Sequence, residues 1–353
     1  MAVAVRQERV LSELSKLDLF QSKSHRGQGR MEERDAKRSM YRPGVTIDIE
    51  RARLITQAYK ATEGEPMVIR RAKALAHLMD NMTLHIYPHE LIVGNMTSKP
   101  NSINTFPELW WRWLDKAIDK EYANMVTDEE RAELHEIHKY WQGKAVHGME
   151  RGLLPEEVRP YWFYPDHGAF LWLHGGHVGT PNYEKVLRTG MNGLIKECEE
   201  RLAELSANPE AYIDEPSYLE QRRFLEAASI SLKALARFGQ RFANKAREIA
   251  AEERDEARKR ELEDIANICE WVPANPARTF REAVQSYWFT NLFTRVLDLQ
   301  SSGYGERLDQ LFYPYYEKDR LEGRITKEET TELLGLLFLK MNEEGGLIPP
   351  AQA

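Results

Sequence analysis

The amino-acid sequence predicts a mainly helical α/β domain with one long irregular loop. The chain has 353 residues, 42% of them hydrophobic and 30% charged, which is enough to bury a large core. Hydrophobic residues recur at helical spacing through most of the chain, whereas the short apolar run Leu91–Gly94 predicts a buried strand. Prolines and a Gly-Gly pair concentrate in residues 155–182, which predicts an ordered loop of a length that often carries function.

A domain boundary is predicted near residue 45. A helix is expected in residues 1–20, and an exposed basic arm in residues 21–43, because the arm contains Gly and Ser and lacks hydrophobic periodicity. Residues 1–44 are therefore interpreted as an N-terminal helix and arm, and residues 45–353 as one domain.

Two helices are expected in residues 47–79, separated by a break at Glu63–Pro66 that places the proline in the first turn of the second helix. Thr279 is predicted to cap a later helix and to form a capping box with Glu282. The other helical segments are expected over Tyr183–Leu205, from Glu215 to about Cys269 with a break near Phe238-Gly239, from Thr279 to about Leu299, over Leu308–Tyr316, and from a cap at Thr326 to Met341.

Composition argues against several classes of function. The chain carries 49 basic and 56 acidic residues, a net charge of −7, and has no basic block, so nucleic-acid binding is not expected. The longest apolar run, Leu333–Leu339, is far shorter than the ~20 residues of a membrane span. No signal-peptide core is found at the N-terminus, and two cysteines cannot form a disulfide framework. A cytoplasmic protein that binds no membrane is expected.

The two cysteines are not expected to be nucleophiles. Cys198 and Cys269 both lie at helical spacing among apolar residues, where a thiol packs as a small hydrophobic group. Neither has a basic cluster nearby in sequence that would lower the pKa of its thiol.

Four histidines suggest familiar motifs that the sequence does not complete. His135 and His138 are three residues apart, whereas the zinc-protease motif needs four, so an exposed polar helix face is expected instead of a metal site. The His174–His177 segment is similar to an oxyanion loop, but the Gly-x-Ser-x-Gly elbow of a serine hydrolase is missing from the sequence. Neither glycine-rich nucleotide motif occurs in the sequence, and we expect no bound metal or cofactor.

An ordered series of short segments carries more information than any one motif. They are Arg51–Tyr59 (RARLITQAY), Glu63–Pro66, Ile69–Ala72, Leu91–Asn95 (LIVGN), Phe106–Glu108, Gly176-His177, Tyr183–Leu187, Gly190, Gly193–Ile195, Pro273–Glu282 (PANPARTFRE), Arg307–Tyr316 (RLDQLFYPYY) and Glu322–Thr326. In this order, from about residue 45 to the end, they resemble the N-terminal part of glycyl radical enzymes, the pyruvate formate-lyase-like superfamily.

This resemblance implies an α/β fold: the helix-rich N-terminal part of a ten-stranded α/β barrel. It also implies anaerobic lyase chemistry, in which a glycyl radical oxidises a Cys to a thiyl radical that abstracts hydrogen from a small-molecule substrate sealed in the barrel. The Gly-Cys-Val-type and Arg-Val-x-Gly-Tyr segments of the family do not occur in these 353 residues. We therefore expect no catalytic residue in this chain and no activity of the chain alone.

The resemblance implies several partners for the complete enzyme. A separate radical SAM activating enzyme would install the glycyl radical, and a C-terminal half would carry both radical residues. The complete enzyme is expected to be a homo-oligomer. A hypothesis of another class is a non-catalytic scaffold that docks a separate catalytic half.

The resemblance places substrate-binding residues in two segments. The first contains His167, Phe170 and Trp172, and the second contains Ser301 and Ser302. Because an apolar, aromatic first segment offers a polyol few hydrogen-bond partners, decarboxylation of an arylacetate is the preferred prediction. A fumarate-adding hydrocarbon synthase, or a C–O or C–N lyase such as a dehydratase, is the alternative within the superfamily. Ordinary core packing would explain the two aromatic residues equally well.

Overall fold

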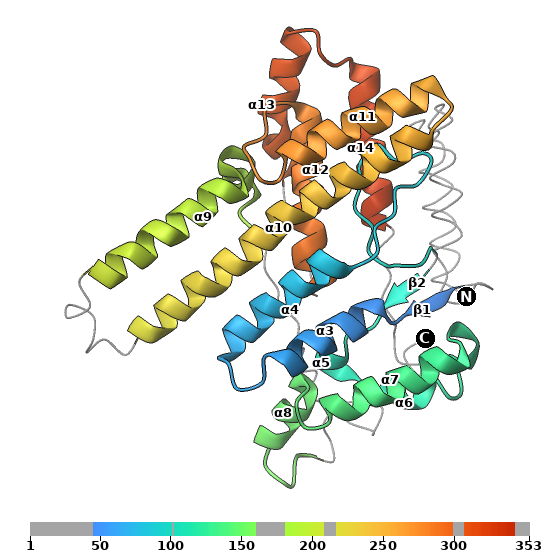
Figure 1. Cartoon of the computed structure of the whole chain (residues 1–353), viewed down its shortest axis with the longest axis vertical. Coiled ribbons are helices and arrows are strands. Elements are labelled where there is room, and N and C mark those ends of the chain that lie inside the picture. Colours follow the sequence, from blue (N-terminus) through green and yellow to red (C-terminus); the bar gives the residue numbers. More distant parts are fainter. Residues whose placement is uncertain (1–44, 101, 160–180, 208–216, 299–306, 343–353) are drawn as a thin grey trace, which may run out of the picture.

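The computed structural model describes residues 45–100, 102–159, 181–207, 217–298 and 307–342, and helices dominate this part of the chain (Figure 1). Two short strands, β1 (Thr46–Asp48) and β2 (Ser102–Asn104), pair in parallel, with Ile47 opposite Ile103. Both isoleucines are buried in the main hydrophobic core. The predicted helix and arm of residues 1–44 lie outside the described residues.

The two helices expected in residues 47–79 are confirmed as α3 (Glu50–Ala61) and α4 (Met67–Asn81), although residues 47 and 48 belong to β1. Asp48 ends β1 and accepts a hydrogen bond from the Glu50 amide at 2.8 Å, which turns the chain into α3. Pro66 is the residue immediately before the first turn of α4. The two helices pack against one another.

A second group of helices follows β2 and lies on the α3 side of the molecule (Figure 1). It comprises α5 (Pro107–Trp110), α6 (Arg112–Ala117), the 3₁₀ turn η1 (Ala123–Met125), α7 (Asp128–Trp141) and α8 (Val146–Leu153). Thr127 and Glu130 form a reciprocal capping box that begins α7. Helices α5 and α7 contact each other, and α7 also contacts α3.

Helix α10 (Tyr218–Glu252) crosses the molecule and packs against α4, α9 (Tyr183–Ala207) and α11 (Glu256–Trp271) (Figure 1). The predicted break near Phe238-Gly239 is wrong, because α10 continues through both residues. Gly239 instead allows close packing, since a Cβ there would lie 2.7 Å from Pro273 Cδ and 2.8 Å from the Val272 carbonyl oxygen. The chain breaks after α10, where Asp255 caps α11.

Helix α12 (Phe280–Asn291) lies in the core and is buried on nearly all sides. It continues as η4 (Leu292–Leu297), a π-helical stretch. The Thr279 cap is confirmed, but the expected box is not complete, because the Glu282 carboxylate accepts its hydrogen bond from the Arg278 amide. Helices α13 (Leu308–Leu321) and α14 (Lys327–Asn342) pack against α12.

The predicted strand Leu91–Gly94 is not a strand in the structure. Its backbone pairs with side chains of α12, because Gln285 bonds to both the amide and the carbonyl of Val93. This segment is nevertheless buried, as its apolar composition predicts: Ile92 and Val93 belong to the core.

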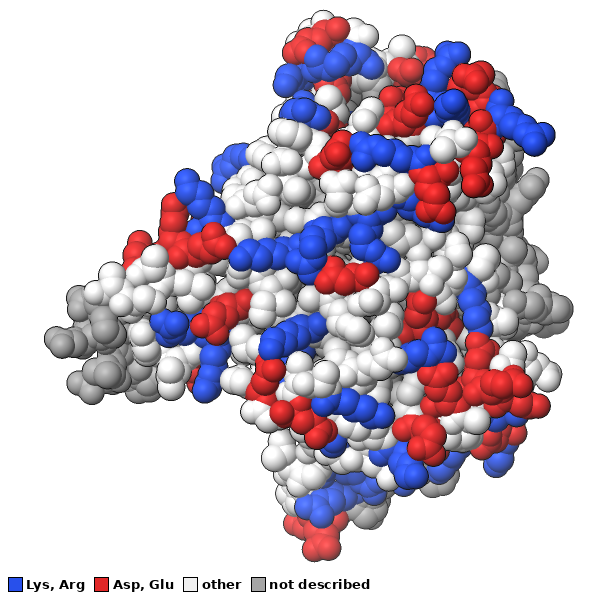
Figure 2. Space-filling view, viewed as in Figure 1, with Lys and Arg blue, Asp and Glu red and all other residues white. Residues whose placement is uncertain are grey.

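The apolar run Leu333–Leu339 forms part of α14. Leu333, Leu336 and Leu337 are buried against the core, whereas Phe338 is 49% exposed. Within the described ranges, every helix is too short or too polar to cross a membrane. On the face seen in Figure 2, basic and acidic side chains are interspersed.

Candidate functional site

Four charged side chains, from α3, α4, α5 and the end of η4, form a cluster. They are Arg51 of α3, Arg71 of α4, Glu108 of α5 and Asp298, which follows η4, and we call them the arginine–carboxylate cluster. Because β1 and β2 are parallel, the helices that follow them, α3 and α5, begin at the same edge of the sheet. This arrangement brings Arg51 and Glu108 together.

Arg51 is 2% exposed and uses its whole guanidinium. Its Nη2 lies 2.5 Å from Glu108 Oε1, and its Nη1 donates to Glu108 Oε2 and to the Thr105 carbonyl, each at 3.2 Å. Its Nε and Nη2 donate to the carbonyl of Leu297 at 3.1 and 2.8 Å. The guanidinium also stacks over the Phe106 ring, 4.1 Å from its centroid.

Arg71 binds Asp298, the residue that follows Leu297. Its Nε donates to Asp298 Oδ1 at 2.6 Å, and its Nη2 donates to the same carboxylate oxygen and to the Asp298 carbonyl, the latter at 2.9 Å. Its Nη1 lies 3.5 Å from Glu108 Oε1. Glu108 therefore stands between the two arginines, each of which binds one of two consecutive residues, Leu297 and Asp298.

The cluster is balanced, with two positive and two negative side chains. Burial alone would raise the pKa of Glu108, but the charges of Arg51 and Arg71 outweigh it and hold that pKa below its ordinary value. Burial would lower the pKa of Arg71, and the carboxylates of Asp298 and Glu108 raise it instead. These shifts favour the ionised forms of Glu108 and Arg71.

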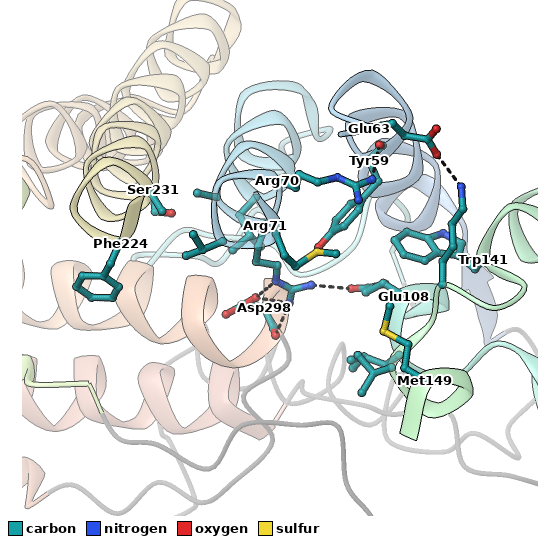
Figure 3. A pocket seen from close by; sticks show the side chains of 18 of the residues that line it. Tyr59, Glu63, Arg70, Arg71, Glu108, Trp141, Met149, Phe224, Ser231 and Asp298 are labelled. Atoms are coloured by element: carbon teal, nitrogen blue, oxygen red, sulfur yellow. Dashed lines mark hydrogen bonds and ion pairs between the residues drawn. The ribbon is translucent and has the colours of Figure 1, made fainter. Parts of the chain in front are cut away.

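A cavity of about 1180 Å³ opens beside the cluster (Figure 3). Arg71, Glu108 and Asp298 line it, and the guanidinium of Arg71 reaches between the two carboxylates. Arg71 is 27% exposed and lines the cavity, whereas Arg51 is 2% exposed and is not among the lining residues. The other walls of the cavity come from α3, α7, α8 and α10. They include Trp141, Met149, Phe224 and Ser231.

The rim and wall of this cavity carry further charged groups. Lys144 Nζ lies 2.6 Å from Glu63 Oε1, which also accepts a hydrogen bond from the Tyr140 hydroxyl at 3.1 Å. Burial raises the pKa of Glu150, whose Oε2 has no hydrogen-bond partner among the described residues. Met67 and Phe224 remain more than half exposed beside these groups, so the cavity combines apolar and charged surface.

The five predicted substrate-binding residues, His167, Phe170, Trp172, Ser301 and Ser302, lie outside the described residues. Two of them, Ser301 and Ser302, follow the cluster closely along the chain. Leu297 and Asp298, which the two arginines bind, are the last described residues before the segment that contains Ser301 and Ser302.

The sequence alone predicted no role for the cluster, although a signal for it is present. Arg51, Arg71 and Glu108 each belong to a segment that carries the family resemblance: RARLITQAY, Ile69–Ala72 and Phe106–Glu108. Charged residues are ordinarily exposed unless they are paired. Charged residues inside apolar helical patterns are therefore candidates for buried ion pairs. Asp298 has no comparable signal in the sequence.

The two histidines of α7 are less exposed than expected. His138 is 1% exposed, so the prediction of an exposed polar face is wrong for this residue. Its Nδ1 and the Nδ1 of His135 both lie 2.8 Å from Asp115 Oδ1, and His135 Nε2 lies 3.1 Å from Asp119 Oδ1. Across the described ranges, no group of three His, Cys, Asp or Glu side chains has an arrangement that could hold a metal ion.

The core position predicted for Cys269 is confirmed, and burial raises the pKa of its thiol. Cys198 is only partly buried on α9. Burial is the largest cause that raises the pKa of its thiol, and the negative charge of Glu197 raises that pKa further. Thiols with raised pKa values carry little thiolate at neutral pH; that neither cysteine is a nucleophile stays a prediction.

Comparison with known proteins identifies the family. Residues 24–352 match the model of the pyruvate formate lyase-like family. Over 320 residues the chain is 38% identical to isethionate sulfite-lyase of Nitratidesulfovibrio vulgaris, a match that covers 84% of this chain and 37% of that protein. An indoleacetate decarboxylase of Tractidigestivibacter scatoligenes is 28% identical over 342 residues.

Solved structures give the same result. The B12-independent glycerol dehydratase of Clostridium butyricum superposes with a TM-score of 0.82 at 32% identity, covering 94% of this chain and 41% of that one. A glycyl radical enzyme of Archaeoglobus fulgidus superposes with a TM-score of 0.72 at 33% identity, covering 89% and 40%. The chain thus spans about two fifths of these relatives and has the fold of the N-terminal part of their barrel. It belongs to the pyruvate formate lyase-like family of glycyl radical enzymes.

Proposed function

We propose that this chain forms the N-terminal part of a glycyl radical lyase that removes a leaving group from the carbon next to a hydroxyl-bearing carbon. The observation that carries the proposal is the order of similarity. The chain is 38% identical to a sulfite-lyase and superposes on a glycerol dehydratase with a TM-score of 0.82, but it is 28% identical to a decarboxylase. Cleavage of a C–O or C–S bond therefore fits better than the decarboxylation that the sequence first suggested.

The proposed reaction balances without an external oxidant or reductant. A substrate of the form HO–CH₂–CHR–X gives the aldehyde R–CH₂–CHO and HX, where X is the second hydroxyl of a diol or, with R as hydrogen, the sulfonate group of isethionate. The carbon that carries the hydroxyl is oxidised and its neighbour is reduced. One hydrogen of the first carbon replaces X on the second, and the hydroxyl proton leaves with X, so the products contain all the hydrogens of the substrate. The radical Gly and the thiyl Cys would come from the C-terminal part, and a radical SAM activating enzyme would install the radical.

The residues of this chain would bind and orient the substrate. Ser301 and Ser302 are proposed to bind its hydroxyl or anionic group, and His167 to add a further polar contact. Phe170 and Trp172 would exclude water from the reacting carbons. Polar contacts that orient a small substrate are stronger where water is excluded.

A second candidate function is decarboxylation of an arylacetate, favoured by the aromatic composition of the segment around Phe170 and Trp172. The two functions differ in what this segment does. In an elimination it supplies a water-excluding wall, whereas in a decarboxylation it binds the ring of the substrate and determines the affinity.

The test reconstitutes the chain with the C-terminal part of the enzyme and activates it with a radical SAM activase. Glycyl radical content is measured first by EPR, so that a failure of assembly is separated from a failure of substrate choice. Isethionate, 1,2-propanediol, glycerol and indoleacetate are then assayed in parallel. We expect an aldehyde from at least one hydroxylated substrate, and we expect replacement of both Ser301 and Ser302 with Ala to raise KM about tenfold or more.

The variant Phe170→Ala distinguishes the two candidate functions. It should lower the rate of elimination without changing which substrate is preferred. If the radical is present, indoleacetate alone turns over and Phe170→Ala abolishes that turnover, the elimination proposal is wrong and the second candidate is supported.

A further inference from the structure

We propose that His135 is a proton-dependent bridge between α6 and α7. Its imidazolium binds Asp115 of α6 and Asp119, which follows α6, and the loss of one proton weakens the attachment of α6 to α7. We call these three side chains the His135 bridge. The proposal depends neither on the substrate nor on the proposed function.

The first observation is that both ring nitrogens of His135 face a carboxylate. Nδ1 lies 2.8 Å from Asp115 Oδ1, and Nε2 lies 3.1 Å from Asp119 Oδ1. An ionised carboxylate only accepts hydrogen bonds, and a neutral imidazole has one N–H, so its second nitrogen would direct a lone pair at an oxygen. Only the imidazolium, which has two N–H groups, satisfies both contacts.

The second observation assigns a single proton to the neighbouring histidine. His138 Nδ1 lies 2.8 Å from the same oxygen, Asp115 Oδ1, and therefore donates its N–H to it. His138 is 1% exposed, and its Nε2 is buried without a hydrogen-bond partner among the described residues. A second proton on Nε2 would bury an unpaired N–H and a charge, which is costly. The histidine of this pair that gains and loses a proton is therefore His135, which is 36% exposed.

The charged groups of α3 and α5 that face α7 bind other partners. Arg53 of α3 binds Glu133 of α7, and Glu108 of α5 belongs to the arginine–carboxylate cluster. On α7 itself, Arg131 Nε lies 4.0 Å from Asp119 Oδ1. The two aspartates of the bridge therefore determine the charge of its histidine.

The direction of the pKa shift agrees with this geometry. Burial lowers the pKa of His135, but hydrogen bonds to Asp115 and Asp119 outweigh it and raise that pKa above its ordinary value. A raised folded pKa stabilises the fold below the unfolded pKa of about 6.5, and this contribution is lost as pH rises through the folded pKa. The bridge is therefore complete in mildly acidic solution and weakens as the pH rises.

The two helices that the bridge joins lie next to one wall of the cavity. Helix α6 follows α5 after a single residue, Trp111, and α7 ends at Trp141. Glu108 and Leu109 of α5 line the cavity, and so does Trp141 of α7. The proton of the bridge thus affects how firmly the elements of this wall are attached to one another.

The test measures amide hydrogen exchange in the 353-residue chain at pH 6 and pH 9, as protection factors that remove the intrinsic effect of pH. Helix α6 also buries Trp113, Leu114 and Ala117, so we expect more frequent local opening, not unfolding. The Ile118 amide donates to the Leu114 carbonyl at 3.0 Å. Its protection should fall roughly threefold from pH 6 to pH 9, because half-exposed charge pairs contribute modestly, while α10 keeps its protection.

Two variants of the bridge should respond differently. In Asp119→Asn an amide can donate a hydrogen bond to Nε2, so a neutral His135 satisfies both contacts, and α6 should stay protected at pH 9. His135→Gln should also remove the pH dependence, but it should leave α6 less protected already at pH 6. His77→Gln is the matched control, because His77 Nε2 faces the neutral side chain of Gln57 at 3.5 Å. It should behave as the unmodified chain does.

Imidazole nitrogen chemical shifts are the second readout. His135 should carry two protons at pH 6 and lose one as the pH rises, whereas His138 should keep one proton, on Nδ1, throughout. The proposal is overturned if His138 is the histidine that titrates, or if the protection of α6 is the same at pH 6 and pH 9. It is also overturned if protection falls equally in α6, α10 and α12, or if Asp119→Asn keeps the pH dependence. If His135→Gln does not fold, the same outcomes are read from Asp119→Asn and from the unmodified chain.

Discussion

The side-chain amide of Gln285 binds both backbone groups of Val93. Its Oε1 accepts a hydrogen bond from the Val93 amide at 2.9 Å, and its Nε2 donates to the Val93 carbonyl at 2.8 Å. Both residues are buried, and Trp288 Nε1 donates to the next carbonyl, that of Gly94, at 3.1 Å. Two side chains of α12 thus supply to this buried segment the hydrogen bonds that a neighbouring strand would provide.

Replacing Gln285 with Ala should therefore destabilise the chain strongly. The substitution leaves a buried amide and a buried carbonyl without partners, and each such group costs about 1–3 kcal/mol. We expect the free energy of unfolding to fall by about 2–4 kcal/mol, as measured by urea denaturation. Gln240→Ala is the control, because Gln240 is exposed and bonds only to Asn244 among the described residues. A Gln285→Ala variant as stable as this control would contradict the assigned contact.

Two glycines in helices should respond to alanine in opposite directions. A Cβ at Gly239 would lie 2.7 Å from Pro273 Cδ and 2.9 Å from the Cys269 carbonyl, so Gly239→Ala should destabilise the chain by about 1–3 kcal/mol. A Cβ at Gly335 of α14 would meet nothing within 4 Å, so Gly335→Ala should stabilise it by about 0.5–1 kcal/mol. Thermal unfolding of both variants measures the difference, and an equal shift in Tm would show that α10 and α11 are not closely packed at Gly239.

The pair formed by His135 and Asp115 should make stability depend on pH. Burial lowers the pKa of His135, but hydrogen bonds to Asp115 and Asp119 outweigh it and raise that pKa. Burial raises the pKa of Asp115, and the hydrogen bonds from His138 and His135 lower it instead. The histidine contribution is present below its unfolded pKa of about 6.5 and is lost as pH rises through the higher folded pKa. The aspartate contribution is present above about pH 3.9 and is lost as pH falls through the lower folded pKa.

His135→Gln should accordingly lower Tm near pH 5.5 and have a much smaller effect near pH 9. NMR titration of His135 in the unmodified chain should give a pKa above 6.5. A difference in Tm that is constant from pH 5 to pH 9 would show that the charge of His135 does not contribute.

The two thiols should differ in accessibility and both should react slowly. Cys269 is buried and should remain unmodified by iodoacetamide until the chain unfolds, whereas Cys198 is partly exposed and should be modified in the folded state. Because burial raises both pKa values, Cys198 should react more slowly than a free thiol. Rapid native labelling of Cys269, followed by mass spectrometry, would contradict its position in the core.

Elements defined by local signals were predictable from the sequence. The two helices in residues 47–79 follow from apolar spacing and the break before Pro66, and the helix starts at Thr279 and Thr326 follow from side-chain capping. The burial of Leu91–Gly94 is predictable from its apolar composition, but the prediction of a strand is wrong. Its partners are on α12, nearly two hundred residues away, and no local pattern encodes them.

The candidate site was predictable only in part, for the same reason. Three members of the arginine–carboxylate cluster lie in segments that carry the family resemblance, but their pairing depends on the parallel register of β1 and β2. Asp298 joins the cluster through a π-helical end of α12 that the apolar periodicity did not distinguish from an ordinary helix. Long-range contacts, not local propensity, thus determine which charged residues meet.

The most direct test of the central claim is a competition experiment on the reconstituted enzyme with its glycyl radical quantified by EPR. A 2-hydroxyalkyl substrate with a leaving group on the neighbouring carbon and a carboxyl-labelled arylacetate are supplied together at equal concentration. Elimination predicts that aldehyde accumulates while labelled carbon dioxide stays at background. Release of labelled carbon dioxide without aldehyde, at the same radical content, would contradict the proposed function.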